Sequence, residues 1–195
     1  MPHDERLKSK PSEDSLRIRL GVAADAPQLA AFGARTFEET FGTQNRPEDL
    51  HAHLTKAFGL TQQTQELLNP NMVTLLAYHD ATLVAFAQIV RNDPPPGIII
   101  DQPVELQRFY VDRPAHGKGI AQWLMRAVHA AARDFGGQNL WLGVWERNPR
   151  AIAFYNKAGF VDRGSHDFFV GSDRQTDRVL VASVLPGRPD TITIG

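Results

Sequence analysis

The sequence predicts a single α/β domain built around a mixed β-sheet. Some segments alternate apolar and polar residues, as strands with one buried face do, and others repeat apolar residues every three or four positions, as amphipathic helices do. Between residues 105 and 159 the two kinds of segment follow one another, which implies a crossover in the second half of the chain. A length of 195 residues suits one such domain.

Composition and charge exclude several other classes of protein. Apolar residues make up 42 % and charged residues 22 % of the chain, which excludes collagen-like, coiled-coil and wholly disordered proteins. The 21 Lys and Arg against 22 Asp and Glu give a formal charge of −1, which provides no basic field for nucleic acid or an anionic membrane. Cysteine is absent, so disulfide scaffolds, thiolate nucleophiles and zinc ribbons are excluded as well.

The two ends of the chain differ from its middle. Residues 1–15 are charged and lack the apolar stretch of a secretory signal, so we expect a disordered leader and a cytoplasmic location. No window approaches the roughly 18 apolar residues that a membrane span requires. The folded domain is expected over residues 16–185, followed by a tail over residues 186–195.

The first half of the chain has clear boundary signals. Asp25 offers an N-cap to a helix that carries Pro27 in its first turn, and Gly59 offers a break in the next helical segment. The expected elements are a strand over 16–20, a helix from 26 to about 41, one or two helices over 47–68, and a hairpin of strands over 72–77 and 83–90.

The second half begins after a loop with three consecutive prolines, residues 91–97, which cannot join an interior ladder. Asn148 and Pro149 mark the start of a short helix, and Gly159 marks its end. The expected elements are a strand over 105–111, a helix over 120–135, a strand over 139–144, a short helix after 148, and short strands over 160–162, 167–170 and 178–185.

A glycine-containing loop joins the strand over 105–111 to the following helix. Gly117 and Gly119 let the backbone approach a ligand, and the N–H groups and dipole of the helix N-terminus favour phosphate. Lys118 is followed by Gly rather than Ser or Thr, and position 122 is Gln, so neither a Walker loop nor a dinucleotide fingerprint is present. The alternative is that the glycines only turn a strand into a helix.

The loop resembles the signature of the GCN5-related N-acetyltransferases. It reads His116, Gly117, Lys118, Gly119, Ile120, Ala121, with His where Arg or Gln is usual. Residues 148–160 resemble the second motif of that family, Asn-x-x-Ala-x-x-Phe-Tyr-x-x-x-Gly-Phe. The resemblance spans about residues 16–185 and implies acetyl-CoA as co-substrate and acetyl transfer to an amine. It also implies the family fold, a mixed, mostly antiparallel sheet of about seven strands that is splayed near its middle and flanked by about four helices.

The resemblance extends to one branch of the family, the bacterial polyamine acetyltransferases of the PaiA type. It is carried by residues 36–50, Phe58, residues 66–70 and residues 170–177. The first of these segments contains the acidic residues Glu38, Glu39, Glu48 and Asp49 against one base, Arg46. Their charge would complement a polycationic acceptor, and the alternative is a solvated helix face.

The resemblance also implies a role for each matching residue. Tyr155 would protonate the departing thiolate, and Asn148 would approach the pantetheine arm. The backbone of Phe109, Tyr110 and Val111 would pair with the pantetheine amides and orient the acetyl carbonyl. Residues 116–121 would hold the pyrophosphate, and Lys157 an outer phosphate. The alternative roles are structural: packing for the aromatic residues, a helix cap for Asn148 and a solvent-exposed cation for Lys157.

The acceptor side carries three further expectations. Glu105 starts the strand before the loop, where relatives often hold a carboxylate that removes the amine proton; the alternative is an ordinary exposed glutamate. His51 and His53 face different sides of a helix and have no third ligand at metal spacing, so no metal site is expected. Trp145 is expected to pack or to line the acceptor cleft.

The resemblance therefore implies an N-acetyltransferase that moves an acetyl group directly from acetyl-CoA to a small primary amine, such as a polyamine, in a ternary complex. An acetyl-enzyme is not expected because no cysteine nucleophile exists. The alternatives are another acceptor, namely a protein N-terminus, an amino acid or an antibiotic amine, and a CoA-binding sensor without turnover. Neither nucleic acid nor a membrane is an expected partner. Homodimers are common in the family, and the sequence shows no interface signature.

Overall fold

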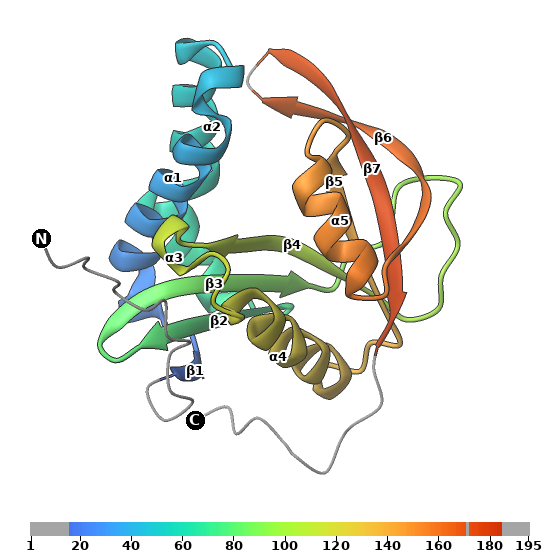
Figure 1. Ribbon diagram of the computed structural model, residues 1–195, viewed down its shortest axis with the longest axis horizontal. Coiled ribbons are helices and arrows are strands. Elements are labelled where there is room, and N and C mark those ends of the chain that lie inside the picture. The colour runs from blue at the N-terminus through green and yellow to red at the C-terminus, as the bar shows by residue number, and fades with distance from the viewer. Residues whose placement is uncertain (1–15, 171, 185–195) are drawn as a thin grey trace, which may run out of the picture.

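The computed structural model describes residues 16–170 and 172–184, which form a seven-stranded sheet with helices on both faces (Figure 1). The strand order is β1-β2-β3-β4-β5-β7-β6, and only β4 and β5 pair in parallel. The strands are β1 (Leu16–Leu20), β2 (Met72–His79), β3 (Thr82–Val90), β4 (Pro103–Val111), β5 (Asn139–Trp145), β6 (Val161–Val170) and β7 (Asp173–Ser183). The mixed α/β fold that the sequence predicts is confirmed.

The helices divide between the two faces of the sheet (Figure 1). They are α1 (Ala26–Phe41), α2 (Pro47–Phe58), α3 (Leu60–Leu68), α4 (Ile120–Asp134) and α5 (Pro149–Lys157). Helices α1 to α3 cover what we name the α1 face, and α4 and α5 cover the α4 face. Helices α2 and α3 meet at Gly59, where the sequence predicts a break. Within the described part of the chain, no helix has the length and apolar character needed to cross a bilayer.

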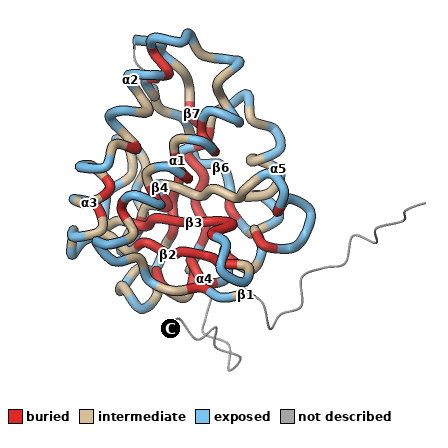
Figure 2. Tube along the Cα trace, turned by 90° about the vertical axis from the view of Figure 1, so that its left-hand side faces the viewer, coloured by how far each residue is buried: buried red, intermediate tan, exposed pale blue. Residues whose placement is uncertain are grey.

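Successive side chains along a strand point to opposite faces of the sheet, so each face has its own hydrophobic core. On β2, Leu76 and Tyr78 pack with the residues of α1 to α3, whereas Leu75 and Ala77 pack with those of α4 and α5. Strands β2 and β3 are buried along most of their length (Figure 2). These two strands are therefore a rigid support for β4, which lies beside them.

Strand β4 stays with β3 but leaves β5 early. Its pairing with β3 continues to Val111, whereas its pairing with β5 ends at Glu105 opposite Trp141. The register with β3 shifts between Gln88 and Ile89, which leaves Gln107 as an extra residue in β4. The sheet therefore opens between β4 and β5, as the family resemblance implies.

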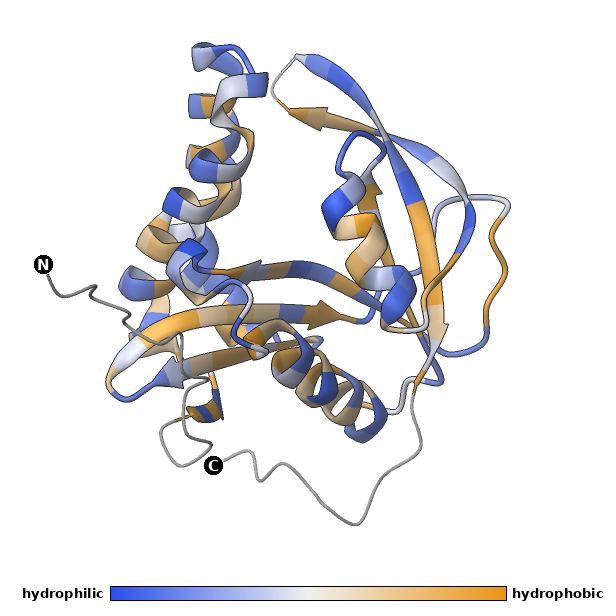
Figure 3. Ribbon diagram, viewed as in Figure 1, coloured by the Kyte–Doolittle hydropathy of each residue, from blue (hydrophilic) through white to orange (hydrophobic). Residues whose placement is uncertain are grey.

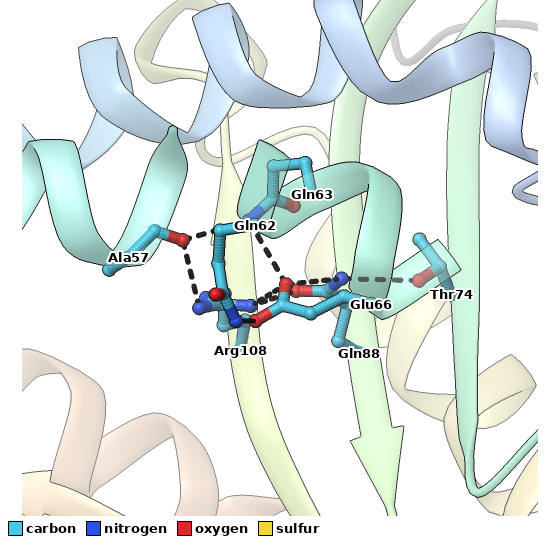
Figure 4. Close-up of polar contacts among 7 residues, drawn as sticks. All are labelled: Ala57, Gln62, Gln63, Glu66, Thr74, Gln88 and Arg108. Carbon is cyan, nitrogen blue, oxygen red and sulfur yellow. Dashed lines mark hydrogen bonds and ion pairs between the residues drawn. The ribbon is translucent and has the colours of Figure 1, made fainter. Parts of the chain in front are cut away.

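A buried ion pair holds α3 against β3 and β4 (Figure 4). Nη1 of Arg108 lies 2.5 Å from Oε2 of Glu66, and the two side chains are only 10 % and 7 % exposed. Arg108 also donates to Oε1 of Gln88 and to the carbonyl of Ala57, and its guanidinium lies over the ring of Phe58. The charges are thus paired and hydrogen-bonded, as buried charges must be.

Two local predictions are wrong. Residues 160–162 and 167–170 do not form separate strands, because β6 runs unbroken with an irregularity between Asp162 and Gly164 that interrupts its alternation. The Asp25 side chain does not cap α1. Its carboxylate instead accepts hydrogen bonds from two residues that precede it, namely from the backbone N–H of Val22 and from the Arg19 guanidinium. The leader over 1–15 and the tail over 186–195 lie outside the described residues.

The Glu66–Arg108 pair makes a stability prediction. Replacing Glu66 with Leu leaves a buried guanidinium uncompensated, so the Glu66→Leu variant is expected to lose about 3 kcal/mol of unfolding free energy. The double variant Glu66→Leu/Arg108→Met removes both charges and is expected to recover most of that loss. Urea unfolding of wild type, the two single variants Glu66→Leu and Arg108→Met, and the double variant measures the coupling, and additive losses in the double variant would contradict a coupled buried pair.

Candidate active site

The departure of β4 from β5 leaves backbone groups facing the gap. On β4 the segment beyond Glu105 contains Phe109, Tyr110 and Val111. Phe109 and Val111 pack on the α4 face, and Tyr110 packs on the α1 face. The backbone N–H and C=O groups on the gap side of this segment have no strand partner in β5, so they are available to a ligand.

The glycine loop lies at the Val111 end of the gap. Gly117 and Gly119 have φ angles of 76° and 82°, and a Cβ atom on either would meet nothing within 4 Å. Nε2 of His116 lies 2.8 Å from the carbonyl oxygen of Val111, so the His side chain closes the loop onto β4. Ile120 is buried in the core and Lys118 is exposed. Of these two predicted residues, Ile120 can therefore offer a ligand only its backbone.

A cavity of about 190 Å³ lies over this loop and the first turn of α4. Its lining includes Gly117, Gly119 and Ala121, and also Arg150 and Phe154 from α5. Sequence analysis did not single out Arg150, although it stands inside the second motif. Lys157 is exposed and is not among the residues that line the cavity. An anion in this cavity would meet both the N-terminus of α4 and the Arg150 guanidinium.

Helix α5 brings two predicted residues toward β4. Oδ1 of Asn148 accepts a 3.1 Å hydrogen bond from the Ala151 N–H, so the side chain caps the helix. The Tyr155 ring lies 6.3 Å from the Phe109 ring, measured between centroids. Burial and the nearby Tyr110 raise the pKa of the Tyr155 phenol, so it remains protonated at neutral pH.

On the α1 face, the hairpin of β6 and β7 reaches α2. The backbone N–H of Ser172 donates a 2.7 Å hydrogen bond to Oδ1 of Asp49, and the Ser172 hydroxyl donates to the same oxygen. Gln175 donates to Oδ1 of Asn45 at 2.9 Å. The hairpin tip is therefore fixed to the start of α2, and the two halves of the domain meet across the gap.

The acidic segment over residues 36–50 is only partly available to an acceptor. Asp49 is occupied by Ser172 and Arg46, and Glu39 pairs with Arg35. Glu38 and Glu48 are exposed.

Aromatic rings fill the junction between the hairpin and the helices. The His53 ring stacks on Phe37 at 4.4 Å between centroids and meets Phe168 edge-on at 6.1 Å. Desolvation lowers the pKa of His53, so the ring is neutral and acts as a packing group. Trp145, at the end of β5, meets Phe41 edge-on. Trp145 therefore lies on the α1 face, beside the gap.

Three titratable side chains gather on the same face. Glu105 accepts a 2.7 Å hydrogen bond from Asn92, and burial raises its pKa against the opposing effects of Asn92 and His166. Asp177 is only 8 % exposed, and burial raises its pKa to about 6 although His166 acts in the opposite direction. His166 thus influences both carboxyl groups.

Asp177 and His166 are functional candidates that sequence analysis missed. Strand β7 is hydrophilic over its first half and hydrophobic beyond it, where Val179 and Val181 are covered by Ile98 and Ile100 (Figure 3). Asp177 lies on the same face of β7 as Val179 and Val181, because alternate residues of a strand share a face. The one signal in the sequence is an acidic residue at an inward position, and strand pairing is needed to place it on the same face of the sheet as Glu105.

Comparisons with known proteins point to one family. The family model described as "Acetyltransferase (GNAT) family" matches residues 35–160. An uncharacterized N-acetyltransferase of Mycobacterium tuberculosis is 34 % identical over 161 residues, which are 83 % of this chain and 99 % of the relative. A Bacillus subtilis spermine/spermidine N(1)-acetyltransferase is 32 % identical over 66 residues, 33 % of this chain and 43 % of the relative. The PaiA N-acetyltransferase of Thermoplasma acidophilum, solved with coenzyme A, has a TM-score of 0.71 at 21 % identity and covers 87 % of this chain and 99 % of its own.

The raised pKa of Asp177 predicts a pH-dependent loss of stability. The unfolded chain releases this proton near pH 4 and the folded chain near pH 6, so wild-type stability falls between these values relative to a variant that cannot ionise. Asp177→Asn is expected to gain about 1–2 kcal/mol relative to wild type as the pH rises from 4 to 7. Urea unfolding of both proteins at several pH values measures this, and a constant difference would contradict it.

Proposed function

This chain belongs to the GNAT acetyltransferase family and is an N-acetyltransferase, and we propose that it transfers the acetyl group of acetyl-CoA directly to a primary amine of a polyamine. The observation that carries the proposal is the gap between β4 and β5, which leads to the glycine loop and the cavity at the N-terminus of α4. Such a site fits an elongated ligand with phosphates at one end and a reactive group at the other.

The coenzyme is assigned to the gap and the loop. The backbone N–H groups of residues 116–121 would hold the pyrophosphate at the N-terminus of α4, with Arg150 as a neighbouring cation. Arg150 is better placed than Lys157 for this contact, because it lines the cavity. The pantetheine arm would pair with the free edge of β4 at Phe109, Tyr110 and Val111, past Asn148. The PaiA N-acetyltransferase of Thermoplasma acidophilum, which has a similar fold and was solved with coenzyme A, supports coenzyme A as the ligand.

The transfer itself needs a polarised carbonyl and a protonated leaving group. The free N–H groups of β4 would polarise the thioester carbonyl, where negative charge develops as the amine attacks. The carbon–sulfur bond then breaks, and the departing thiolate takes the phenolic proton of Tyr155. Burial raises the pKa of this phenol, so Tyr155 carries its proton at neutral pH. Cysteine is absent from the chain, so no thiolate stands ready to form an acetyl-enzyme, and direct transfer is the simpler route.

Glu105 is the proposed base. The amine nitrogen must lose a proton to attack, and Glu105 lies where β4 and β5 separate. Burial raises the pKa of its carboxyl group, which increases its proton affinity, and the hydrogen bond from Asn92 holds it in place. The proton goes to Glu105 directly or through a water molecule.

The polyamine acceptor rests on two observations. A Bacillus subtilis relative bears the name spermine/spermidine N(1)-acetyltransferase, and its similarity covers a third of this chain. In addition, the exposed Glu38 on α1 and Glu48 on α2 and the buried Asp177 on β7 are carboxylates that a polycation would complement.

Thiol release from acetyl-CoA tests the proposal. An aromatic disulfide reporter is suitable because the protein has no cysteine of its own. We expect turnover with spermidine and spermine, and a rate at least about tenfold lower with amino acids and peptide N-termini. Turnover only with another amine would support the acetyltransferase activity but contradict a polyamine as the acceptor. Coenzyme binding without thiol release for any of these amines would favour a CoA-binding sensor.

Tyr155→Phe tests the acid. The variant keeps the ring and its packing but removes the proton, so kcat is expected to fall about 10²-fold while the KM for acetyl-CoA changes little. Tyr78→Phe is the matched control, because that hydroxyl bonds Gln28 and Arg19, away from the gap. An unchanged kcat in Tyr155→Phe would remove this residue from the mechanism.

A further inference from the structure

A glycine in the middle of β5 opens the α1 face beside the gap. Leu142 and Val144 are buried on the opposite face, whereas Gly143 is exposed to solvent. A Cβ atom on Gly143 would lie 3.1 Å from Oδ2 of Asp177 and 3.1 Å from Nε2 of His166. The absence of a side chain at Gly143 therefore allows the Asp177 carboxylate and the His166 ring to lie close over β5. Gly143 lies just beyond Trp141, the last residue of β5 that pairs with β4.

Asp177 lacks a partner at this point. Its side chain is buried, and Oδ1 makes no hydrogen bond within the described part of the chain. Two outward-facing carboxylates of β6, by contrast, each form an ion pair: Asp162 pairs with Arg178, and Asp167 pairs with Arg174. A buried carboxylate without a donor is costly, so its missing donor is expected from a bound molecule.

The surroundings of Asp177 select the chemistry of that molecule. Glu105 adds a second carboxyl group near His166, which disfavours an anion. Trp145 lies directly opposite Asp177 in the β5–β7 ladder, and Phe168 follows His166 on the same side of β6. Carboxylates with aromatic neighbours suit an alkylammonium, because the charged nitrogen binds the carboxylates while its methylene groups pack on the rings.

We infer that Asp177 binds the primary ammonium of the acceptor above Gly143, next to the place where β4 and β5 separate. The inference rests on the proposed function, because it assigns the acceptor site of the same reaction. Glu105 lies on the same face of the sheet and remains the proposed base. Asp177 is a binding residue in this scheme, and its loss affects the amine rather than the coenzyme.

The experiment compares wild type, Asp177→Asn, Gly143→Ala and Asp167→Asn. Asp167 is the matched control, because it is a neighbouring carboxylate that is half exposed and paired with Arg174. Steady-state kinetics give KM for spermidine and for acetyl-CoA separately, and calorimetry measures spermidine binding to the CoA-loaded proteins without turnover.

Asp177→Asn is expected to raise the KM and the Kd for spermidine at least about tenfold, with the KM for acetyl-CoA within about twofold of wild type. Gly143→Ala should weaken spermidine binding in the same way, because its methyl group would push the Asp177 carboxylate and the His166 ring from their places. Asp167→Asn should change neither constant. The unfolding midpoint of each variant shows that it is folded.

Two results overturn the inference in distinguishable ways. If wild type acetylates spermidine and Asp177→Asn does so with the same KM and Kd, the binding role of Asp177 is wrong and the proposed function stands. If wild type neither acetylates nor binds spermidine, the polyamine function and the assignment of its ammonium to Asp177 are both wrong.

Discussion

The buried Arg108 determines the path of β4, and the site depends on that path. One extra residue, Gln107, shifts the side chains of β4, so that Leu106 packs on the α4 face and Arg108 faces α3. A guanidinium inside the protein requires a carboxylate and further acceptors, and Glu66, Gln88 and the Ala57 carbonyl provide them (Figure 4). The helices on the α1 face therefore hold β4 to β3 at the level where it parts from β5.

The same departure of β4 produces both halves of the site. On the strand edge it frees backbone groups over residues 106–111, and on the α1 face it leaves Gly143 uncovered. The coenzyme is thus assigned to the free edge of β4, and the acceptor is assigned to the α1 face beside the same gap. Direct transfer requires this geometry, because the nitrogen must reach the carbonyl carbon while the coenzyme stays in place.

Features of this structure that depend on neighbouring residues could be predicted from the sequence. Features that depend on contacts between distant segments could not. The glycine loop, the Asn148 cap and the break at Gly59 are encoded by neighbouring residues, so pattern alone identifies them. Asp49 belongs to the acidic segment that was expected either to complement a polycation or to form a solvated helix face, yet it binds the distant Ser172. Arg150 and Asp177 were missed for the same reason, since the role of each depends on a cavity or a ladder formed by segments far apart in the chain.

Asp177 leaves one buried carboxylate oxygen on the proposed acceptor side without a hydrogen bond within the described residues. Arg108 and Asp49, which are also buried, have partners within the protein, whereas Oδ1 of Asp177 has none in the described residues. Ionising Asp177 in the empty protein therefore lowers stability, and a bound ammonium would restore that loss by pairing with the carboxylate. The same pairing would make the site prefer an ammonium to a neutral molecule of the same shape. A neutral molecule would leave the Asp177 carboxylate buried and unpaired.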